Sequence, residues 1–355
     1  MLISGHDSKC FTDDVSESLP VTQAFRITTV FPPDKIHLRA GIWELPEGKE
    51  PRAICVLLNG MSEFLEKYAE VAGELNARGF VAVSLDWRSQ GASERGRAGN
   101  RASHVASFEG YDRDLAALML QAVEPLLRKN PVPVIALAHS MGAHILLRFL
   151  HEHPRRIACA ALTTPLLEID TGKYSPEVAS WVATAMNLRR PSTRMIFGLE
   201  DRDPLKVAFE DNLCTSDRER FERSKAVLKQ QPFLRVFGPT IGWLGAAFQS
   251  MRRIKRHGFP EAIKTPVLIF GAGKDRIVKT APIRDYAKRL PNARYVEIEN
   301  SEHEILMEND AIRSQFWAGF DAFVDEQLKS AVPFASPPRA PAGEKPARGF
   351  TGKAG

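Results

Sequence analysis

Three polar residues, each in the turn after a run typical of a strand, could together catalyse acyl transfer. Ser140 follows the run 134–139, Asp275 follows the run 266–270, and His303 follows the run 293–298. Acyl transfer needs an activated hydroxyl, a base that accepts its proton and an acid that holds the base in the correct tautomer. We therefore predict Ser140 as the nucleophile, His303 as the general base and Asp275 as the acid, acting through an acyl-enzyme.

The segment around Ser140 predicts how a serine could be presented for this chemistry. A strand-type run, a serine at a tight turn and a helix-type run form the pattern of a nucleophile elbow. Ala138 and Gly142 flank the serine as the small residues that such a turn requires, although Ala138 stands where glycine is usual. The segment alone fits equally well a serine that caps a buried helix. The order Ser140, Asp275, His303 along the chain favours the catalytic interpretation.

Backbone amides are the expected donors to the oxyanion that forms during acyl transfer. Met141 directly follows the nucleophile at the start of the predicted helix, where free amides favour negative charge. The second donor is predicted to be Met61, in the loop after the strand Ala53–Leu58, because Gly60 allows that loop a close approach.

Several alternatives for these roles remain open. Asp86 and Asp170 are rival acids, and Asp275 itself could cap a turn. His139, beside the serine, is expected to pack at the strand end and not to act as the base. His303 is followed by Glu-Ile-Leu-Met-Glu and so does not form an H-E-x-x-H motif. We therefore expect no metal and no cofactor.

The elements around these residues predict an α/β architecture. Residues 25–30 and 35–45 are expected to pair as an antiparallel hairpin with a turn at 31–34. From residue 53 to 164, short apolar strands alternate with helical segments, a pattern typical of a mostly parallel sheet flanked by helices. Such sheets bind ligands at the carboxyl ends of their strands, where residues distant in sequence can meet.

The strand–helix alternation is interrupted, and this divides the chain. Residues 1–20 are expected to form a flexible arm, 21–165 the first part of the core, and 261–330 its second part. Residues 166–260 are helical, basic and aromatic in character and predict an inserted helical cap without a convincing strand. Residues 331–355 are rich in Pro, Ala, Gly and Lys, and we expect them to be disordered.

Composition excludes some classes of function. The chain has 355 residues and a formal net charge of +5. Four basic residues and one acidic residue in the tail 331–355 account for +3 of this, so the remainder is nearly neutral and does not predict nucleic-acid binding. The four cysteines form no C-x-x-C pair, which favours a reduced, cytoplasmic chain. No apolar run is long enough to span a bilayer, and the polar start is not of secretory type.

On the basis of these residues, the chain resembles the α/β-hydrolase superfamily over about residues 25 to 328. More narrowly, it is similar to the lysophospholipase L2 and monoacylglycerol lipase group, also described as serine aminopeptidase S33-like. The motifs that carry the resemblance are His139-Ser140-Met141-Gly142, residues 86–93, residues 273–278, residues 302–308 and, in the predicted cap, residues 238–244. The resemblance implies an α/β-hydrolase fold and a Ser-His-Asp triad.

The chain departs from the family pattern at a few positions. The family's oxyanion loop usually reads H-G-x-x-E-H, whereas residues 59–64 here read Asn-Gly-Met-Ser-Glu-Phe. Ala138 and Ser89 each replace a glycine. Backbone donors survive such changes, but the side chains that support the loop must differ.

The resemblance and the predicted cap together suggest a lysophospholipid or monoacylglycerol ester as substrate. Cap aromatics, Trp243 among them, suit an acyl chain. The basic run 252–256 suits an anionic head group or an anionic membrane surface, or it is simply a solvated helix face. An S33-type aminopeptidase would need acidic cap residues to hold a free amine, for which Glu200, Asp201 and Asp203 are candidates. A non-catalytic binding protein of the same fold is the third alternative.

Overall fold

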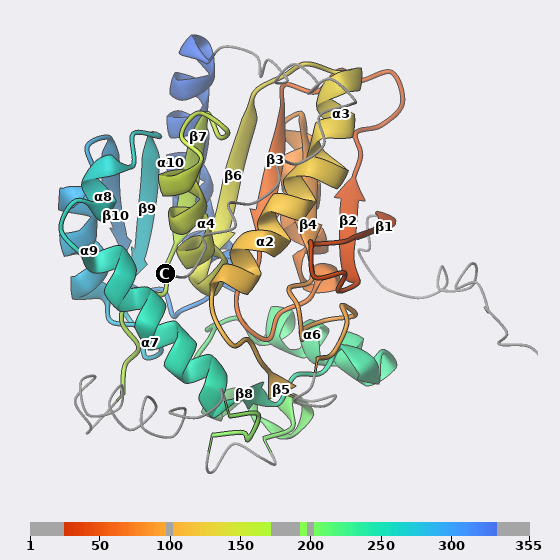
Figure 1. The fold of residues 1–355 in the computed structure, drawn as a ribbon, viewed down its shortest axis with the longest axis vertical. Coiled ribbons are helices and arrows are strands. Elements are labelled where there is room, and N and C mark those ends of the chain that lie inside the picture. The colour runs from red at the N-terminus through yellow and green to blue at the C-terminus, as the bar shows by residue number, and fades with distance from the viewer. Residues whose placement is uncertain (1–24, 97–101, 172–191, 197–201, 332–355) are drawn as a thin grey trace, which may run out of the picture.

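The computed structural model describes residues 25–96, 102–171, 192–196 and 202–331. An eight-stranded sheet is its centre (Figure 1). Its strands are β1 (Arg26–Val30), β2 (Leu38–Trp43), β3 (Ala53–Leu58), β4 (Phe80–Leu85), β6 (Val134–His139), β7 (Cys159–Thr163), β9 (Val267–Ala272) and β10 (Ala293–Ile298).

The sheet order is β1-β2-β4-β3-β6-β7-β9-β10. β1 and β2 form the predicted antiparallel hairpin, and β2 also runs antiparallel to β4. All the remaining neighbours are parallel. The predicted mostly parallel sheet is therefore confirmed. Because β6, β9 and β10 run in the same direction, the segments that follow them leave the sheet at one edge.

Helices cover both faces of the sheet and create two apolar cores. Alternate residues of β3 divide between these cores: Ile54, Val56 and Leu58 face one, and Cys55 and Leu57 face the other. One core is closed by α2 (Glu109–Leu118), α3 (Glu124–Lys129), α4 (Ser140–Glu152), α7 (Ile241–Lys255), α8 (Phe259–Ala262) and α9 (Thr280–Arg289), and the other by α1 (Ala69–Ala77) and α10 (Asp310–Ser330). Burial on both faces explains why the central strands are continuous apolar runs.

The predicted helices are present, with local differences. The helix expected from residue 65 begins as a 3-10 turn (Leu65–Tyr68) before α1. Gly79, at φ +81°, ends it, as expected of a glycine after a helix. The helix expected over 108–129 contains a π-helical turn (Met119–Val123) between α2 and α3.

The segment between β7 and β9 contributes α6 (Arg218–Gln230), α7 and α8. In Figure 1, α6 and α7 both lie below the sheet, with α7 on the left. The expectation of no strand here was wrong in one detail. β8 (Gly238–Pro239) pairs in parallel with β5 (Ala102–Ser103), a two-residue ladder too short to recognise from sequence pattern. Part of the predicted cap, 172–191 and 197–201, lies outside the described residues, as do the predicted arm and residues 332–355.

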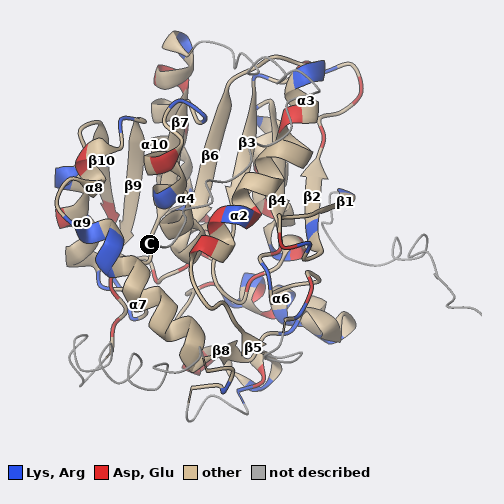
Figure 2. Ribbon diagram, viewed as in Figure 1, with Lys and Arg blue, Asp and Glu red and all other residues tan. Residues whose placement is uncertain are grey.

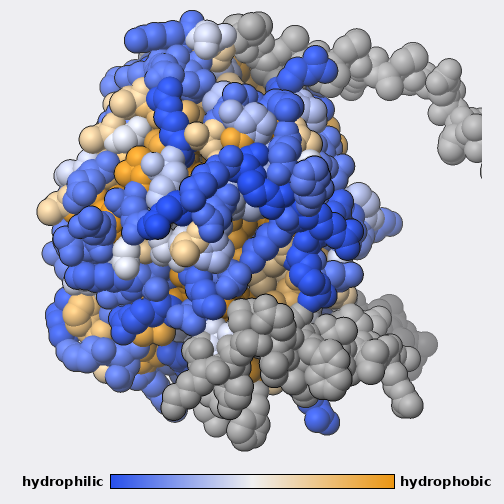
Figure 3. All heavy atoms as spheres, turned by 90° about the vertical axis from the view of Figure 1, so that its left-hand side faces the viewer, coloured by the Kyte–Doolittle hydropathy of each residue, from blue (hydrophilic) through white to orange (hydrophobic). Residues whose placement is uncertain are grey.

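Acidic and basic residues are interspersed over the described ribbon (Figure 2). The face that includes α9 and β10 is mostly hydrophilic, with only small apolar areas (Figure 3). The edge strand β10 carries Arg294 and Glu297, which are ion-paired to Glu326 and Arg284 respectively. Charged side chains of this kind protect an edge strand from pairing with another chain.

Candidate active site

The predicted elbow is formed by the junction of β6 and α4. β6 ends at His139 and α4 begins at Ser140, whose φ of +48° lies in the left-handed region. A non-glycine residue in this region is strained, as expected of a nucleophile elbow.

Gly142 is required for a reason different from the one that the sequence suggested. A Cβ on Gly142 would lie 2.5 Å from the carbonyl oxygen of Asn59 and 2.6 Å from that of Leu58. The nearest crowding at Gly142 thus comes from the end of β3 and not from Ala138. Ala138 pairs in the sheet with Leu58 and Leu162, where its methyl group is accommodated.

The three residues predicted for catalysis form one hydrogen-bonded chain. Ser140 Oγ lies 3.0 Å from His303 Nε2, and His303 Nδ1 lies 2.7 Å from Asp275 Oδ2. The side chains of His303 and Asp275 are 5% and 0% exposed. The other oxygen of Asp275 accepts hydrogen bonds from the amides of Ile277 and Val278, at 2.8 and 2.9 Å. The carboxylate is therefore fixed, and it favours the tautomer in which Nε2 can accept a proton from the serine.

The two predicted oxyanion donors belong to segments that meet at Ser140. Met141 is in the first turn of α4, where backbone amides have no partner within the helix. A Cβ on Gly60 would lie 3.4 Å from Ser140 Cβ and 3.0 Å from His139 Cδ2. Glycine therefore lets the loop that carries Met61 pass directly against the nucleophile.

The alternative residues have other partners. Asp86 is buried, forms an ion pair with Arg39 at 2.6 Å and accepts hydrogen bonds from the amides of Leu65 and Ala92. It thus holds the turn after β4. The backbone amide of Asp170 donates to Ile277 O at 2.9 Å. His303 is hydrogen-bonded to Asp275 and not to Asp86 or Asp170. His139 Nδ1 lies 3.1 Å from Thr163 Oγ1, which agrees with a packing role at the strand end.

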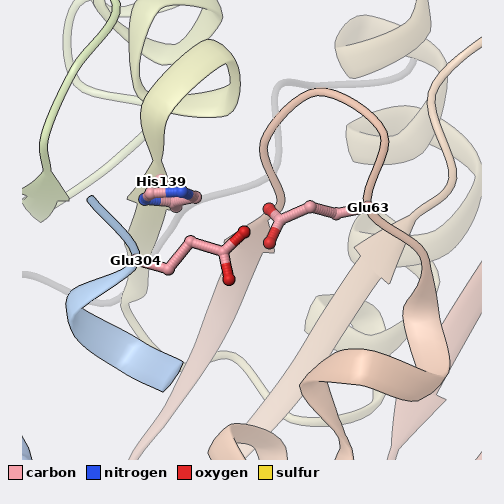
Figure 4. Close-up of side chains that lie close together, drawn as sticks. All are labelled: Glu63, His139 and Glu304. Carbon is pink, nitrogen blue, oxygen red and sulfur yellow. The ribbon is translucent and has the colours of Figure 1, made fainter. Parts of the chain in front are cut away.

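A buried cluster of charges links the oxyanion loop to the histidine loop. Lys67 Nζ lies 2.7 Å from both carboxylate oxygens of Glu304 and 2.9 Å from Glu63 Oε1. Glu63 Oε2 accepts hydrogen bonds from the Gly60 amide and from the Tyr68 hydroxyl. Figure 4 shows Glu63 and Glu304 converging beside His139. Because Glu304 directly follows His303, Lys67 connects the loop of the general base to the loop of Met61.

The protonation states in this cluster follow from burial and from the pairing. Burial alone would raise the pKa of Glu63, but the Lys67 ammonium and the hydrogen bonds lower that pKa to about 2. Burial alone would lower the pKa of Lys67, but the carboxylates of Glu304 and Glu63 raise it above its usual value. Burial lowers the pKa of His139 to about 3, against the opposing effect of Glu63. His139 is therefore neutral at physiological pH.

Glu63, His139 and Glu304 are also the one cluster among the described residues whose ligand atoms could hold a metal ion, since these atoms lie within 4.8 Å of one another. The ammonium of Lys67 is already bonded to both carboxylates. A metal ion would have to displace this internal cation, so the donor set fits a lysine ion pair better than a metal.

The insertion contacts both catalytic loops. Cys214 O accepts the Glu304 amide at 2.7 Å, and Thr215 Oγ1 donates to Met307 O at 2.7 Å. Phe64, which replaces a family histidine in the oxyanion loop, packs with Val227 and Leu228 of α6. The other replacement, Asn59, is buried and donates from its amide group to Leu85 O at 3.1 Å. Both departures from the family pattern thus have a structural role.

The remaining predicted site residues make other contacts. Trp243 is buried against Phe108 and donates its indole N–H to the Tyr111 hydroxyl at 3.1 Å. These partners are not members of the hydrogen-bonded chain, and a substrate contact for Trp243 stays a prediction.

The basic run is partly neutralised. Arg253 pairs with Glu109 and Glu152, and Lys255 pairs with Glu168. Of the acids considered for binding an amine, Asp203 pairs with Arg235 at 3.3 Å, and Glu200 and Asp201 lie outside the described residues.

Sequence reasoning missed four supporting residues: Glu63, Lys67, Gln90 and Glu304. Gln90 is buried in the turn after β4 and accepts a hydrogen bond from the Ser62 amide. The i,i+4 spacing of Glu63 and Lys67 was visible in the sequence as a possible helical ion pair. Nothing in the sequence indicated that Glu304 or the oxyanion loop would join it.

The strand order, the serine at the strand–helix elbow and the Asp and His after later strands define the α/β-hydrolase class. The family model for serine aminopeptidase, S33, matches residues 49–310, and the chain belongs to this family.

Known relatives agree with this class. The chain is 31% identical over 272 residues to lysophospholipase L2 of Escherichia coli K12, covering 74% of this chain and 77% of the relative. It is 25% identical to phospholipase YtpA of Bacillus subtilis, over 78% of this chain and 97% of the relative. The fold is similar to that of a monoglyceride lipase from Saccharomyces cerevisiae, with a TM-score of 0.69 and 17% identity, over 88% of this chain and 98% of the other.

Proposed function

We propose that the protein is a serine hydrolase that cleaves the carboxylic ester of a monoacyl lipid, a lysophospholipid or a monoacylglycerol. The observation that carries this proposal is the hydrogen-bonded chain from Ser140 Oγ through His303 to Asp275. The substrate class rests on the relatives, which are named lysophospholipases and monoacylglycerol lipases.

The geometry supports a two-step reaction. As Ser140 Oγ attacks the ester carbonyl, His303 Nε2 accepts the hydroxyl proton, and Asp275 stabilises the imidazolium that forms. The amides of Met61 and Met141 donate to the oxyanion. His303 then gives the proton to the departing alcohol, which leaves an acyl group on Ser140. Water then attacks this ester with His303 again as the base. The bond between the acyl group and Ser140 Oγ breaks, His303 returns the proton to Ser140, and the fatty acid is released.

We propose that the insertion, 166–260, serves as the cap over this site, between the core segments 21–165 and 261–330. Its support is the contact of Cys214 with the histidine loop and of α6 with Phe64. In this position the cap borders both the general base and the oxyanion loop. Trp243 is our candidate within it for a contact with the acyl chain.

We further propose a cytoplasmic enzyme that meets its lipid at a membrane surface. No helix among the described residues is long and apolar enough to cross a bilayer. Cys55 and Cys159 are free and buried in the sheet, which suits a reducing compartment. The exposed Arg256, at the end of α7, is the candidate for contact with anionic lipid.

A substrate panel tests the proposal. Purified protein is assayed with lysophospholipids, monoacylglycerols, short p-nitrophenyl esters and aminoacyl amides, and fatty acid or amine release is measured. We expect turnover of the monoacyl lipids at a higher kcat/KM than of the amides. A preference for aminoacyl amides would make the protein an aminopeptidase. Absence of turnover, together with no fluorophosphonate label on Ser140, would make it a non-catalytic binding protein.

A further inference from the structure

The amide of Met61 lies between two peptide groups that are held by side chains. The Gly60 amide before it donates to Glu63 Oε2, and the Ser62 amide after it donates to Gln90 Oε1 at 2.5 Å. Within the part of the chain that the structure describes, the Met61 amide itself has no hydrogen-bond acceptor. Two fixed peptide groups thus flank one free donor, which is the arrangement an oxyanion hole needs.

Gln90 is built into the fold firmly enough to hold this loop. Its side chain is fully buried. Its backbone amide donates to Trp87 O at 3.0 Å, and its backbone carbonyl accepts a hydrogen bond from the Ser93 amide at 3.1 Å. The turn that carries Gln90 is in turn held by the buried Asp86. The acceptor is therefore placed by the turn after β4 and not by the oxyanion loop that it holds.

The loop needs such support because Ser62 has a φ of +65°, in the left-handed region. A serine in this region is strained, so the loop would relax without a compensating contact. Gln90 also approaches the other predicted donor residue, since its Nε2 lies 4.0 Å from Met141 Sδ. One side chain thus contacts both segments that donate to the oxyanion.

We propose that Gln90 is a positioning residue of the oxyanion hole. It holds the Ser62 peptide in its strained conformation and so aims the Met61 amide at the reacting carbonyl. The inference rests on the proposed hydrolase function. The oxyanion is absent from the bound substrate and forms as the transition state is reached. A change in the direction of the Met61 N–H should therefore lower kcat and leave KM nearly unchanged.

Gln90→Met tests this, because methionine is of similar size and cannot accept the Ser62 hydrogen bond strongly. Loss of an oxyanion donor lowers kcat by about 10²–10³-fold, and a misdirected donor should cost about 10- to 100-fold. We expect that fall in kcat with a KM within about threefold of wild type. The rate at which a fluorophosphonate labels Ser140 should fall in parallel, because its phosphoryl oxygen occupies the same position. Gln90→Glu, which keeps an acceptor, should retain more activity than Gln90→Met.

Gln121→Met is the matched control. It removes the same kind of hydrogen bond, from the Phe31 amide to Gln121 Oε1 at 3.0 Å, in the turn after β1 and outside the active site. Its kcat should stay within about threefold of wild type. The inference is overturned if Gln90→Met keeps the wild-type kcat, or if Gln121→Met loses as much. Should Gln90→Met not fold, Gln90→Asn, whose acceptor is withdrawn by one methylene, must show the same fall. A wild-type protein that neither hydrolyses esters nor accepts the label would instead overturn the proposed function, and this inference with it.

Discussion

Lys67→Met removes the one ammonium that the buried carboxylates of Glu63 and Glu304 share. The Lys67 side chain is 11% exposed, and its Nζ lies within 2.9 Å of both partners. Removing one member of a buried ion pair leaves an uncompensated charge and typically costs about 3–5 kcal/mol. We expect a loss of this size in the free energy of unfolding at pH 7.5, measured by urea denaturation.

The pH dependence of this loss gives a sharper test. In the wild type the pKa of Glu63 is lowered from 4.5 to about 2. The ionised carboxylate therefore stabilises the fold fully above pH 4.5, and this stabilisation is lost as pH falls from 4.5 toward 2. Without the ammonium, burial raises the pKa of Glu63 above the usual value. Stability of the variant then decreases as pH rises through that raised pKa. The difference between variant and wild type should therefore be smaller at pH 5 than at pH 7.5.

Two further variants complete the experiment. Lys67→Arg keeps a cation and should recover most of the stability. Lys288→Met breaks the exposed ion pair with Asp285, in which the two side chains are 69% and 71% exposed, and should change stability far less than Lys67→Met does. The reasoning would be refuted if Lys67→Met lowered the free energy of unfolding as little as Lys288→Met does. It would also be refuted if the loss in Lys67→Met were larger at pH 5 than at pH 7.5.

Three other changes test separate parts of the account. Gly142→Ala places a Cβ about 2.5 Å from two backbone carbonyls, so the elbow must shift. The kcat should fall by at least about tenfold. A variant with the wild-type kcat and melting temperature would contradict this packing. Asp275→Asn should lower kcat by roughly 10⁴-fold because the tautomer of His303 is no longer fixed, and a fall of less than tenfold would point to another acid. His144 is buried in α4, where its ring nitrogens bond to Leu166 O and Ser250 Oγ. Burial lowers the pKa of His144 to about 3, below its usual 6.5, so His144 stays neutral in the fold and stability falls as pH falls from 6.5. Melting temperature between pH 6.5 and 5 should thus fall less steeply in His144→Gln than in wild type, and equal slopes would contradict this.

The parts of the site that sequence could predict are those fixed by sheet topology. Ser140, Asp275 and His303 each follow a strand-type run, and parallel strands bring such positions to one edge. That logic needs only the order of the elements. It predicted the mostly parallel sheet and the hydrogen-bonded chain without any knowledge of side-chain contacts.

The supporting residues could not be predicted, because their roles depend on contacts between loops. Lys67 and Glu304 are 237 positions apart and meet only when the segments that follow β3 and β10 fold against each other. Gln90 resembles any turn residue until the Ser62 amide is placed against it. Ser89 replaces a family glycine and still adopts a φ of +64°, which the sequence alone would not suggest for serine. For Trp243 the sequence suggested a role that the structure does not require. Its aromatic side chain in the predicted cap suggested a ligand contact, but its buried position is also that of a packed core residue.

The central claim is that Ser140 carries the acyl group during ester hydrolysis, and Ser140→Ala tests it most directly. Fatty acid release from a lysophospholipid and from a monoacylglycerol is measured for this variant and for wild type under the same conditions. Loss of the nucleophile should lower kcat by about 10⁶-fold while the melting temperature shows that the fold is intact. A folded Ser140→Ala protein that still releases fatty acid within about tenfold of the wild-type rate would contradict the account.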